Sequence, residues 1–448
     1  MTDTIQRSLP PRVELARPMS SAADPTWTGA VWVGAVDLAE VPGDDAGTVL
    51  LDDAAGHRSA RLLVRDGVAP LGFVDLPVSD GTLDVAALRA AVAALPAVPQ
   101  PPIPVRLPST SVVLCTRDRA DQLGAALDSL LALDHPDFEV VIVDNAPSDE
   151  STRLLVDALD DERVRYVREP VPGLSSARNA GVRAARYEIV AFTDDDVVVD
   201  RSWLRAVASG FSRGDDVLCV SGLVASGELR TPTQRYFDER VTWSRNLEPR
   251  VHRLSAPPAD RPLFPFAVGD YGTGANFAMR RSAITELGGF DEALGVGTVT
   301  GGGEDIDMFA RVVLSGAALV VEPAALVWHR HRADLPALRK QAEGYGTGLG
   351  AWLTKIALHP HTLGMALQRA PRAVRHLLTG TAAEPTTAQV EAPAPAATEA
   401  VTAPLDDAAF LREVGRMRWV ELLAVGRGVL RYARSRRTVR ARERTADR

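Results

Sequence analysis

The sequence predicts an α/β protein whose main domain is a mixed, mainly parallel sheet covered by helices on both faces. Two observations predict this class. From residue 110 onward, strand patterns alternate with segments of helical period, and the strand segments are apolar along their whole length. Unbroken apolar strands joined through helices are typical of parallel sheets that are buried on both faces. The length of 448 residues also predicts two or three domains rather than one.

The first hundred residues predict a small domain ahead of the main one. Residues 1–26 are expected to form a flexible arm. Short apolar runs broken by glycine and aspartate predict strands, and 83–95 has the period of a helix. We therefore expect a small α+β domain over 27–95. The proline-rich residues 96–109 predict a stiff, extended linker.

The main domain is expected to cover 110–350. Its predicted strands lie at 111–115, 138–143, 164–167 and 189–193. Helices are predicted between them, near 119–133, 152–159 and 175–185. The glycine-rich residues 344–350 predict either a hinge or a break in a helix.

Three segments are expected after the main domain. Residues 351–378 continue a helical pattern, and the low-complexity residues 379–405 predict a disordered linker. Residues 406–448 combine apolar side chains at helical spacing with many arginines, which predicts a basic amphipathic tail. We expect this tail either to lie on an anionic membrane surface or to pack on the main domain.

The composition excludes several classes of protein. A net charge of −8 provides no overall basic field for binding nucleic acid. Cys115 and Cys219 lie inside apolar strand segments, which predicts buried free thiols in a reducing compartment. The N-terminus lacks the apolar core of a secretory signal, and no stretch reaches the length of a membrane span. We therefore expect a cytoplasmic protein.

Polar residues gather directly after the predicted strands, where ligands bind in open parallel sheets. They follow the first, second and fourth strands: Thr116, Arg117 and Arg119; Asp144; and Asp194, Asp195 and Asp196. Three adjacent carboxylates repel one another, and a divalent cation supplies the missing counter-charge. Mg²⁺ or Mn²⁺ held by few carboxylates completes its shell with phosphates, so a nucleotide is the expected ligand. The alternative is a solvated acidic turn.

A second acidic group follows three glycines in GGGEDIDMFAR, from Gly301 to Arg311. Glu304 and Asp305 stand at the start of a predicted helix, where carboxylates also serve as caps. A carboxylate in this place can also take a proton from an attacking hydroxyl group. Asp307 is expected either to cap the helix or to pair with Arg311.

Residues 110 to about 335 resemble the family 2 glycosyltransferases, which have the GT-A fold. The resemblance rests on SVVLCTRDR, VVIVDN, GLSSARNAG, AFTDDD, GTGANFAMRR, LGGFDEALG, GGGEDIDMFARVVLSG and VWHRH, which occur in the family's order. It covers about half of the chain. It implies an inverting transfer of a sugar from a nucleotide-sugar donor to a hydroxyl acceptor, with Mn²⁺ or Mg²⁺ as the cofactor.

The resemblance also implies roles for single residues. Asp144 would contact the nucleobase, Asp194 would lie near the ribose, and Asp196 would bind the metal, with Asp195 between the two. Asp305 would be the general base, with Glu304 as its acidic neighbour. A histidine completes the metal shell, and His329 fits this role, with His331 as a close rival. Two further sets are expected: Arg117 and Arg178 at the base or phosphate, and Gly274, Asn276, Gly302 and Gly303 on the acceptor side.

Two other functions remain open at this point. A nucleotidyltransferase would keep the nucleotide and the metal, but TRDRADQL after the first strand lacks the glycine-rich, basic phosphate loop of such enzymes. The other is an inactive scaffold on a membrane surface, against which the intact acidic residues argue. A lipid-linked acceptor is frequent among the enzymes that the chain resembles, and it would suit a tail bound to the inner face of the cell membrane.

Overall fold

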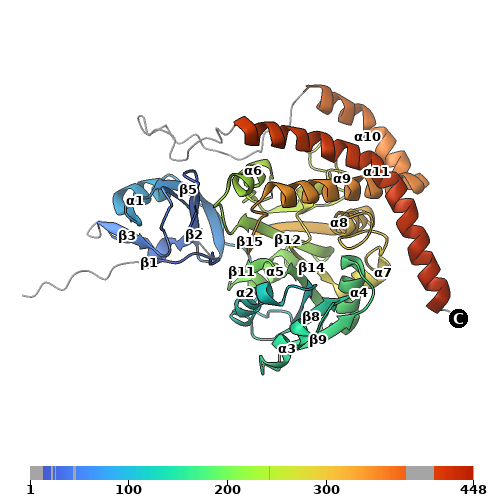
Figure 1. Cartoon of the computed structure of the whole chain (residues 1–448), viewed down its shortest axis with the longest axis horizontal. Helices are drawn as coiled ribbons and strands as arrows, with labels where there is room; N and C mark the ends of the chain where they lie inside the picture. Colours follow the sequence, from blue (N-terminus) through green and yellow to red (C-terminus); the bar gives the residue numbers. More distant parts are fainter. Residues whose placement is uncertain are drawn as a thin grey trace, which may run out of the picture.

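The computed structural model describes residues 14–21, 24–25, 27–43, 47–241, 243–379 and 408–446. The segments expected to be a flexible arm and a disordered linker therefore lie partly or almost wholly outside the described residues. A mixed sheet with helices on both faces forms the centre of the molecule, and a helical tail follows it (Figure 1). The α/β class predicted from the sequence is confirmed.

The central sheet has its longest strand, β15, near one end. Its strand order is β11 (Val197–Val199), β15 (Ala318–His329), β12 (Val217–Ser226), β14 (Asn276–Arg280), β10 (Ile189–Asp194), β7 (Thr110–Thr116), β8 (Phe138–Asn145) and β9 (Val164–Glu169). Strand β13 (Arg250–His252) also pairs with β15. Strands β11, β13 and β14 are antiparallel to their neighbours, and the others share one direction. The carboxyl ends of β7, β8 and β10 therefore meet at one edge.

Helices cover both faces of this sheet because its strands are apolar on both sides. One core lies under α2 (Ala120–Leu131), α3 (Ser151–Asp157) and α5 (Trp203–Phe211). The other lies under α4 (Leu174–Ala184), α7 (Arg281–Glu286) and α8 (Glu304–Leu314). Cys115 and Cys219 are free and buried in the second core. Burial on two faces is what the apolar strand segments predicted.

The described residues of the N-terminal unit form two small sheets, one α-helix and one short 3-10 helix, η1 (Leu38–Glu40). The first sheet consists of β1 (Glu14–Leu15), β3 (Thr48–Leu51) and β6 (Thr82–Asp84). The second consists of β2 (Val31–Asp37), β4 (Ser59–Asp66) and β5 (Ala69–Pro77), and helix α1 spans Val85–Ala93. Strands β2 to β5 and helix α1 lie in segments for which the sequence predicted strands and a helix, whereas β1 lies within the residues expected to be a flexible arm and β6 overlaps the start of the predicted helix.

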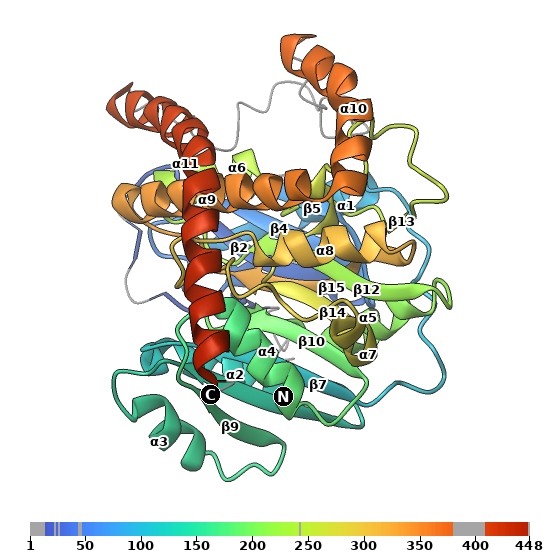
Figure 2. The same ribbon diagram turned by 90° about the vertical axis from the view of Figure 1, so that its right-hand side faces the viewer.

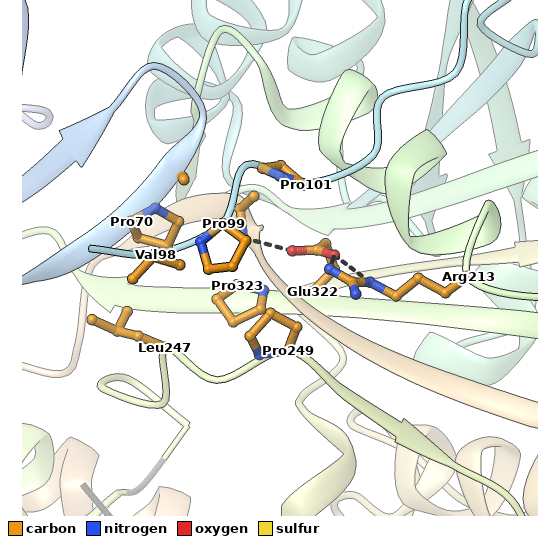
Figure 3. A pocket seen from close by; sticks show the side chains of 11 residues that line it. Pro70, Val98, Pro99, Pro101, Arg213, Leu247, Pro249, Glu322 and Pro323 are labelled. Atoms are coloured by element: carbon orange, nitrogen blue, oxygen red, sulfur yellow. Dashed lines mark hydrogen bonds and ion pairs between the residues drawn. The ribbon is translucent and has the colours of Figure 1, made fainter. Parts of the chain in front are cut away.

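The N-terminal unit packs against the β12–β15 part of the central sheet. Val31, Val33 and Leu63 share a buried apolar cluster with Leu326 and Trp328 of β15. Two ion pairs cross the same contact: Arg61 Nη1 lies 2.9 Å from Asp238 Oδ2, and Arg65 Nη1 lies 2.5 Å from Asp200 Oδ2. At the edge of the contact, linker prolines lie near the ion pair between Arg213 and Glu322 (Figure 3).

Helix α9 (Leu335–Leu358) runs unbroken through residues 344–350. The sequence-based expectation of a hinge or helix break there, and of a domain boundary at 350, is therefore wrong. Helix α11 (Ala408–Ala446) crosses α9, and α10 (Pro360–Thr379) lies beyond it (Figure 2). A Cβ on Gly346 would lie 2.4 Å from Glu421 O, and one on Gly350 would lie 2.0 Å from Val425 O. The glycines allow two helix backbones to touch.

The opposite side of α9 touches the loop that precedes α8. A Cβ on Gly348 would lie 2.6 Å from the carbonyl carbon of Gly302 and 2.9 Å from Gly303 N. Thr347 Oγ1 donates a hydrogen bond of 2.6 Å to Thr300 O. Helix α9 thus separates the glycine loop at 301–303 from α11, in direct contact with both.

Helix α11 is docked by one of its faces. Phe410, Val414 and Met417 are buried beside Phe237 of helix α6 (Pro232–Arg240), and Tyr432 Oη donates to Asp291 Oδ2 at 3.0 Å. The packing alternative that the sequence left open is thus the arrangement in this structure. The outward face remains apolar in part, with Trp419, Leu422, Leu423 and Leu430 exposed. Among the described residues, no helix has the length and apolar character needed to cross a bilayer.

Candidate active site

The acidic turn between β10 and β11 lies at the edge where the parallel strands end. Asp195 is buried there, and its carboxylate accepts from Thr116 Oγ1 at 2.8 Å and from Arg119 Nη1 at 2.6 Å. Thr116 and Arg119, expected to contact the nucleotide, therefore hold the middle aspartate in this structure. Arg119 Nη1 also lies 3.4 Å from Asp196 Oδ2, so one arginine contacts two carboxylates of the turn.

Asp196 and His329 face each other because β11 and β15 pair directly after the turn. Val197 is the register partner of His329, and Asp196 Oδ1 lies 3.3 Å from His329 Nε2. Burial alone would raise the pKa of Asp196, but His329 and the arginines Arg332 and Arg119 outweigh it and lower that pKa. Burial would lower the pKa of His329, but Asp196 outweighs this effect and the pKa is raised. Each of the two side chains therefore stabilises the charged form of the other.

The pair of Asp196 and His329 fits a divalent ion that a substrate would also bind. A carboxylate oxygen and an imidazole nitrogen lie 3.3 Å apart, and both are ordinary ligands of Mn²⁺. Within the described ranges, no group of three or more His, Cys, Asp or Glu side chains is arranged to hold a metal ion. The shell would therefore need oxygens from a bound phosphate. His331, the rival ligand, is buried, and each of its ring nitrogens already has a partner.

Arg178 connects the acidic turn to the start of α8. Its buried guanidinium lies 3.8 Å from Asp194 Oδ1 through Nη2 and 3.1 Å from Glu304 Oε1 through Nη1. Desolvation raises the pKa of Asp194 to about 7, with Asp196 adding to the effect and Arg178 opposing it. Burial, reinforced by the charge of Asp305, likewise raises the pKa of Glu304 to about 7. The positive charge of Arg178 is therefore shared between Asp194 and Glu304, and it does not fully compensate the negative charge of either carboxylate.

Asp305 is the more accessible acid at the start of α8. It is half-buried, and its Oδ2 accepts from Gly274 N at 2.8 Å. Gly274 O in turn accepts from Arg178 Nη2 at 2.9 Å. A Cβ on Gly274 would lie 2.7 Å from Arg178 Nη2 and 3.1 Å from Asp305 Oδ2, so a larger residue would displace both. Gly274 thus holds Asp305 in place through its backbone.

Asp144 lies at the end of β8 with one oxygen available. Tyr166 Oη donates to Asp144 Oδ2 at 2.9 Å, whereas Oδ1 is buried without a hydrogen-bond partner in the described part of the chain. Burial raises the pKa of Asp144, and Tyr166 opposes this. A buried acceptor without a partner is costly, and a donor on a bound base would satisfy it. Arg117 is half exposed, 3.6 Å from the carboxylate of Asp118.

Three residues expected on the acceptor side are packed against other parts of the protein in this structure. Asn276 is fully buried: its Oδ1 accepts from Trp203 Nε1 at 2.8 Å, and its Nδ2 donates to Leu223 O and Ala325 O. Its polar atoms join strands of the sheet, so that expectation is wrong. Gly302 and Gly303 face α9 rather than open space, because that helix lies against their backbones.

Of the two alternatives that the sequence left for Asp307, pairing with Arg311 is the one found in the structure, whereas the position of Tyr166 was not predicted. Asp307 is buried in ion pairs with Arg311 at 2.8 Å and Lys355 at 2.9 Å, so it is a structural group of α8. Tyr166 was missed as a site residue. Only the pairing of β8 with β9 brings it next to Asp144, and the sequence offered no more than an aromatic residue in a strand.

Comparisons with known proteins agree with these observations. Residues 111–288 match the family described as "Glycosyl transferase family 2". A relative from Mycobacterium tuberculosis named "Pre-mycofactocin glycosyltransferase" is 31% identical over 239 residues, which cover 53% of this chain and 46% of the relative. A "Glucosyl-dolichyl phosphate glucuronosyltransferase" from Haloferax volcanii is 24% identical over 188 residues, covering 41% and 56%. The chain thus spans about half the length of the curated relatives it matches.

One solved structure is similar over most of the chain. It is titled "Mannosyltransferase PcManGT from Pyrobaculum calidifontis in complex with GDP-Man and Mn2+". The two proteins are 20% identical, with a TM-score of 0.47 and coverage of 73% of this chain and 89% of the other.

Proposed function

We propose, from the glycosyl transferase family 2 domain that this chain contains, that the protein transfers a sugar from a nucleotide-diphosphate sugar to a hydroxyl acceptor with inversion. The observation that carries the proposal is the bridge made by Arg178. This side chain links Asp194 of the acidic turn to Glu304, next to Asp305. The acidic turn, which we propose binds the cation, and the pair of Glu304 and the accessible Asp305 therefore lie at the two ends of one arginine, which supports a donor on one side and an attacking acceptor on the other.

The roles follow from the geometry of each side chain. Asp305, half-buried and held by Gly274, takes the proton of the acceptor hydroxyl while the oxygen bonds to the anomeric carbon. The bond between that carbon and the diphosphate oxygen breaks, and the leaving group keeps the electron pair. Asp196 and His329 would hold Mn²⁺ or Mg²⁺, which when bound offsets charge on the diphosphate. Asp144 Oδ1 accepts from the base.

The test measures nucleoside diphosphate released from a panel of nucleotide sugars, with and without Mn²⁺. We expect release that depends on one donor and on the metal, and a product of inverted anomeric configuration by NMR. Transfer of a nucleotidyl group, seen as released pyrophosphate, would favour a nucleotidyltransferase instead. Retention of configuration would remove Asp305 from the role of base.

We further propose that the protein binds the surface of an anionic membrane through the outward face of α11. Trp419 is 69% exposed and Leu430 77% exposed, and Leu422 and Leu423 lie between them. Arginines flank these residues with their side chains in solvent, among them Arg416 and Arg427. Apolar groups beside exposed cations fit a bilayer interface with anionic headgroups. This placement would suit a lipid-linked acceptor, the class that the name of the Haloferax volcanii relative indicates for that protein.

Flotation with anionic vesicles tests the membrane proposal. Leu423→Glu combined with Leu430→Glu should abolish co-flotation, and high salt should weaken the binding of the unchanged protein. Leu154→Glu is the matched control, because Leu154 is 62% exposed on α3, outside the C-terminal helices. Flotation of the double variant at the level of the unchanged protein would refute the proposal. A concentration-dependent dimer that the same double variant disrupts would assign the face to a second copy instead.

A further inference from the structure

A line of buried hydrogen bonds leads from His329 away from the acidic turn. His329 Nδ1 lies 3.0 Å from His331 Nδ1, and His331 Nε2 lies 2.9 Å from Ser226 Oγ. Ser226 Oγ lies 2.6 Å from Asp238 Oδ1. Asp238 Oδ2 then pairs with Arg245 and, at 2.9 Å, with Arg61 of the N-terminal unit. The line thus joins β15, β12, α6 and β4.

The chemistry of its end fixes the direction of every bond in this line. Asp238 is flanked by two arginines, so its carboxylate is an acceptor, and Ser226 must donate its hydroxyl proton to it. The Ser226 oxygen is then left to accept from His331 Nε2–H. A neutral His331 with its proton on Nε2 has Nδ1 free as an acceptor. His329 must therefore donate from Nδ1.

This assignment leaves His329 Nε2 as the nitrogen that faces Asp196, 3.3 Å from Oδ1. The ring of His331 cannot easily turn out of the line. It is buried against Phe237, with 4.7 Å between the ring centroids, and Trp243 lies on another side at 6.1 Å. Metal-binding histidines commonly donate their second ring proton to such a fixed acceptor, which holds the ring and its tautomer.

We propose that His331 is a positioning residue and that the N-terminal unit, through Arg61, helps to position the proposed metal site. Through Ser226 and Asp238, Arg61 anchors the line that holds His329 Nε2 toward the metal position. The inference rests on the proposed function, because it presumes that His329 and Asp196 bind a divalent ion. It gives residues 27–95 a task that their own fold does not reveal.

The test is Mn²⁺ affinity, measured by electron paramagnetic resonance with UDP or GDP present, beside the melting temperature of each variant. His331→Phe removes the acceptor while filling the space, and we expect affinity to fall by about 10–100-fold. His331→Asn keeps an oxygen near the place of Nδ1 and should stay within about 3-fold of the unchanged protein, on the same reasoning. If His331→Phe binds Mn²⁺ as tightly as the unchanged protein, the positioning role is wrong, although the proposed transferase function stands.

Two arginines of β4 provide a matched pair for the N-terminal unit. Arg61 and Arg65 both form ion pairs with the main domain, but only Arg61 reaches Asp238. Arg61→Leu should weaken Mn²⁺ binding, less than His331→Phe because Arg245 remains, and Arg65→Leu should leave it unchanged. Equal effects of the two would refute the anchoring role. Failure of the unchanged protein to bind Mn²⁺ would overturn the proposed metal site itself.

A measurement on the unchanged, metal-free protein tests the inference without any substitution that could affect stability. Long-range ¹⁵N–¹H NMR of the metal-free protein reports which nitrogen of each histidine carries hydrogen. We expect a proton on Nδ1 of His329, a proton on Nε2 of His331, and none on Nδ1 of His331. A proton on His331 Nδ1 would contradict the direction of the line, whatever the variants do.

Discussion

Gly426 and Gly428 lie two residues apart on α11, and the same substitution should act on them with opposite sign. A Cβ on Gly426 meets nothing within 4 Å. A Cβ on Gly428 would lie 2.6 Å from Ala351 N and 2.6 Å from Thr347 O, both backbone atoms of α9. Because backbone atoms cannot turn aside as a side chain can, Gly428→Ala must push the two helices apart.

The magnitude follows from two opposing effects. Replacing glycine by alanine inside a helix stabilises it by up to about 1 kcal/mol, and both variants gain this. Overpacking a tight contact costs about 1–3 kcal/mol, and only Gly428→Ala bears this cost. The difference between the two variants is therefore about 1–3 kcal/mol in favour of Gly426→Ala.

Thermal unfolding, together with hydrogen exchange of the α11 amides, measures this difference. We expect Gly426→Ala to melt slightly above the unchanged protein, and Gly428→Ala to melt lower with faster exchange in α11. Equal melting temperatures and equal exchange for both would show that α11 does not dock on α9 through these glycines. Activity measured in parallel would show whether detachment of α11 reaches the active site.

The other predictions concern the active site. Asp305→Asn should lower kcat by about 10²–10⁴-fold while nucleoside diphosphate binding by calorimetry stays intact; near-normal turnover would move the role of base to another group. Asp196→Ala should remove the Mn²⁺ dependence of that binding, and its persistence would place the metal elsewhere. The pKa of Glu304, raised to about 7, means that its contribution to stability is present below its ordinary pKa near 4.5 and lost as pH rises through 7. Glu304→Gln should therefore lose less melting temperature between pH 5 and pH 8 than the unchanged protein, and parallel curves would argue against a buried, neutral Glu304. Gly348→Ala should destabilise the protein and lower turnover together, because its Cβ would lie 2.6 Å from the Gly302 carbonyl carbon; turnover unchanged despite a lower melting temperature would disconnect α9 from the loop.

The residues at the strand ends could be predicted from the sequence because the apolar pattern of each strand shows where the strand stops. Unbroken apolar strands predict a parallel sheet, and such sheets place the residues after each strand at one edge. That reasoning brought Asp144 and the turn 194–196 together before any contact was known. It could not tell which carboxylate faces His329, because this depends on the β11–β15 register and on the arginines around Asp196.

Other features depend on contacts between distant segments and left no local signal. Asn276 follows a glycine motif, yet its side chain is committed to Trp203 and two backbone carbonyls inside the sheet. The glycines at 344–350 suggest flexibility by composition, whereas their actual use is close packing on two sides. Val414, Met417 and Tyr432 belong to the apolar side chains at helical spacing in the tail, and the sequence alone could not decide whether they face a membrane or the main domain; the fold buries them against the main domain.

The double contact of α9 constrains how the length of this region can change. A helix advances 1.5 Å and turns 100° with each residue. One residue inserted between Gly344 and Gly350 would rotate the following glycines out of line, so that α9 could fit the loop at 301–303 or α11, but not both. The spacing of these glycines therefore has to match the loop at 301–303 and helix α11 at the same time. Insertions should be tolerated beyond Leu358, where α9 has ended, and not within it.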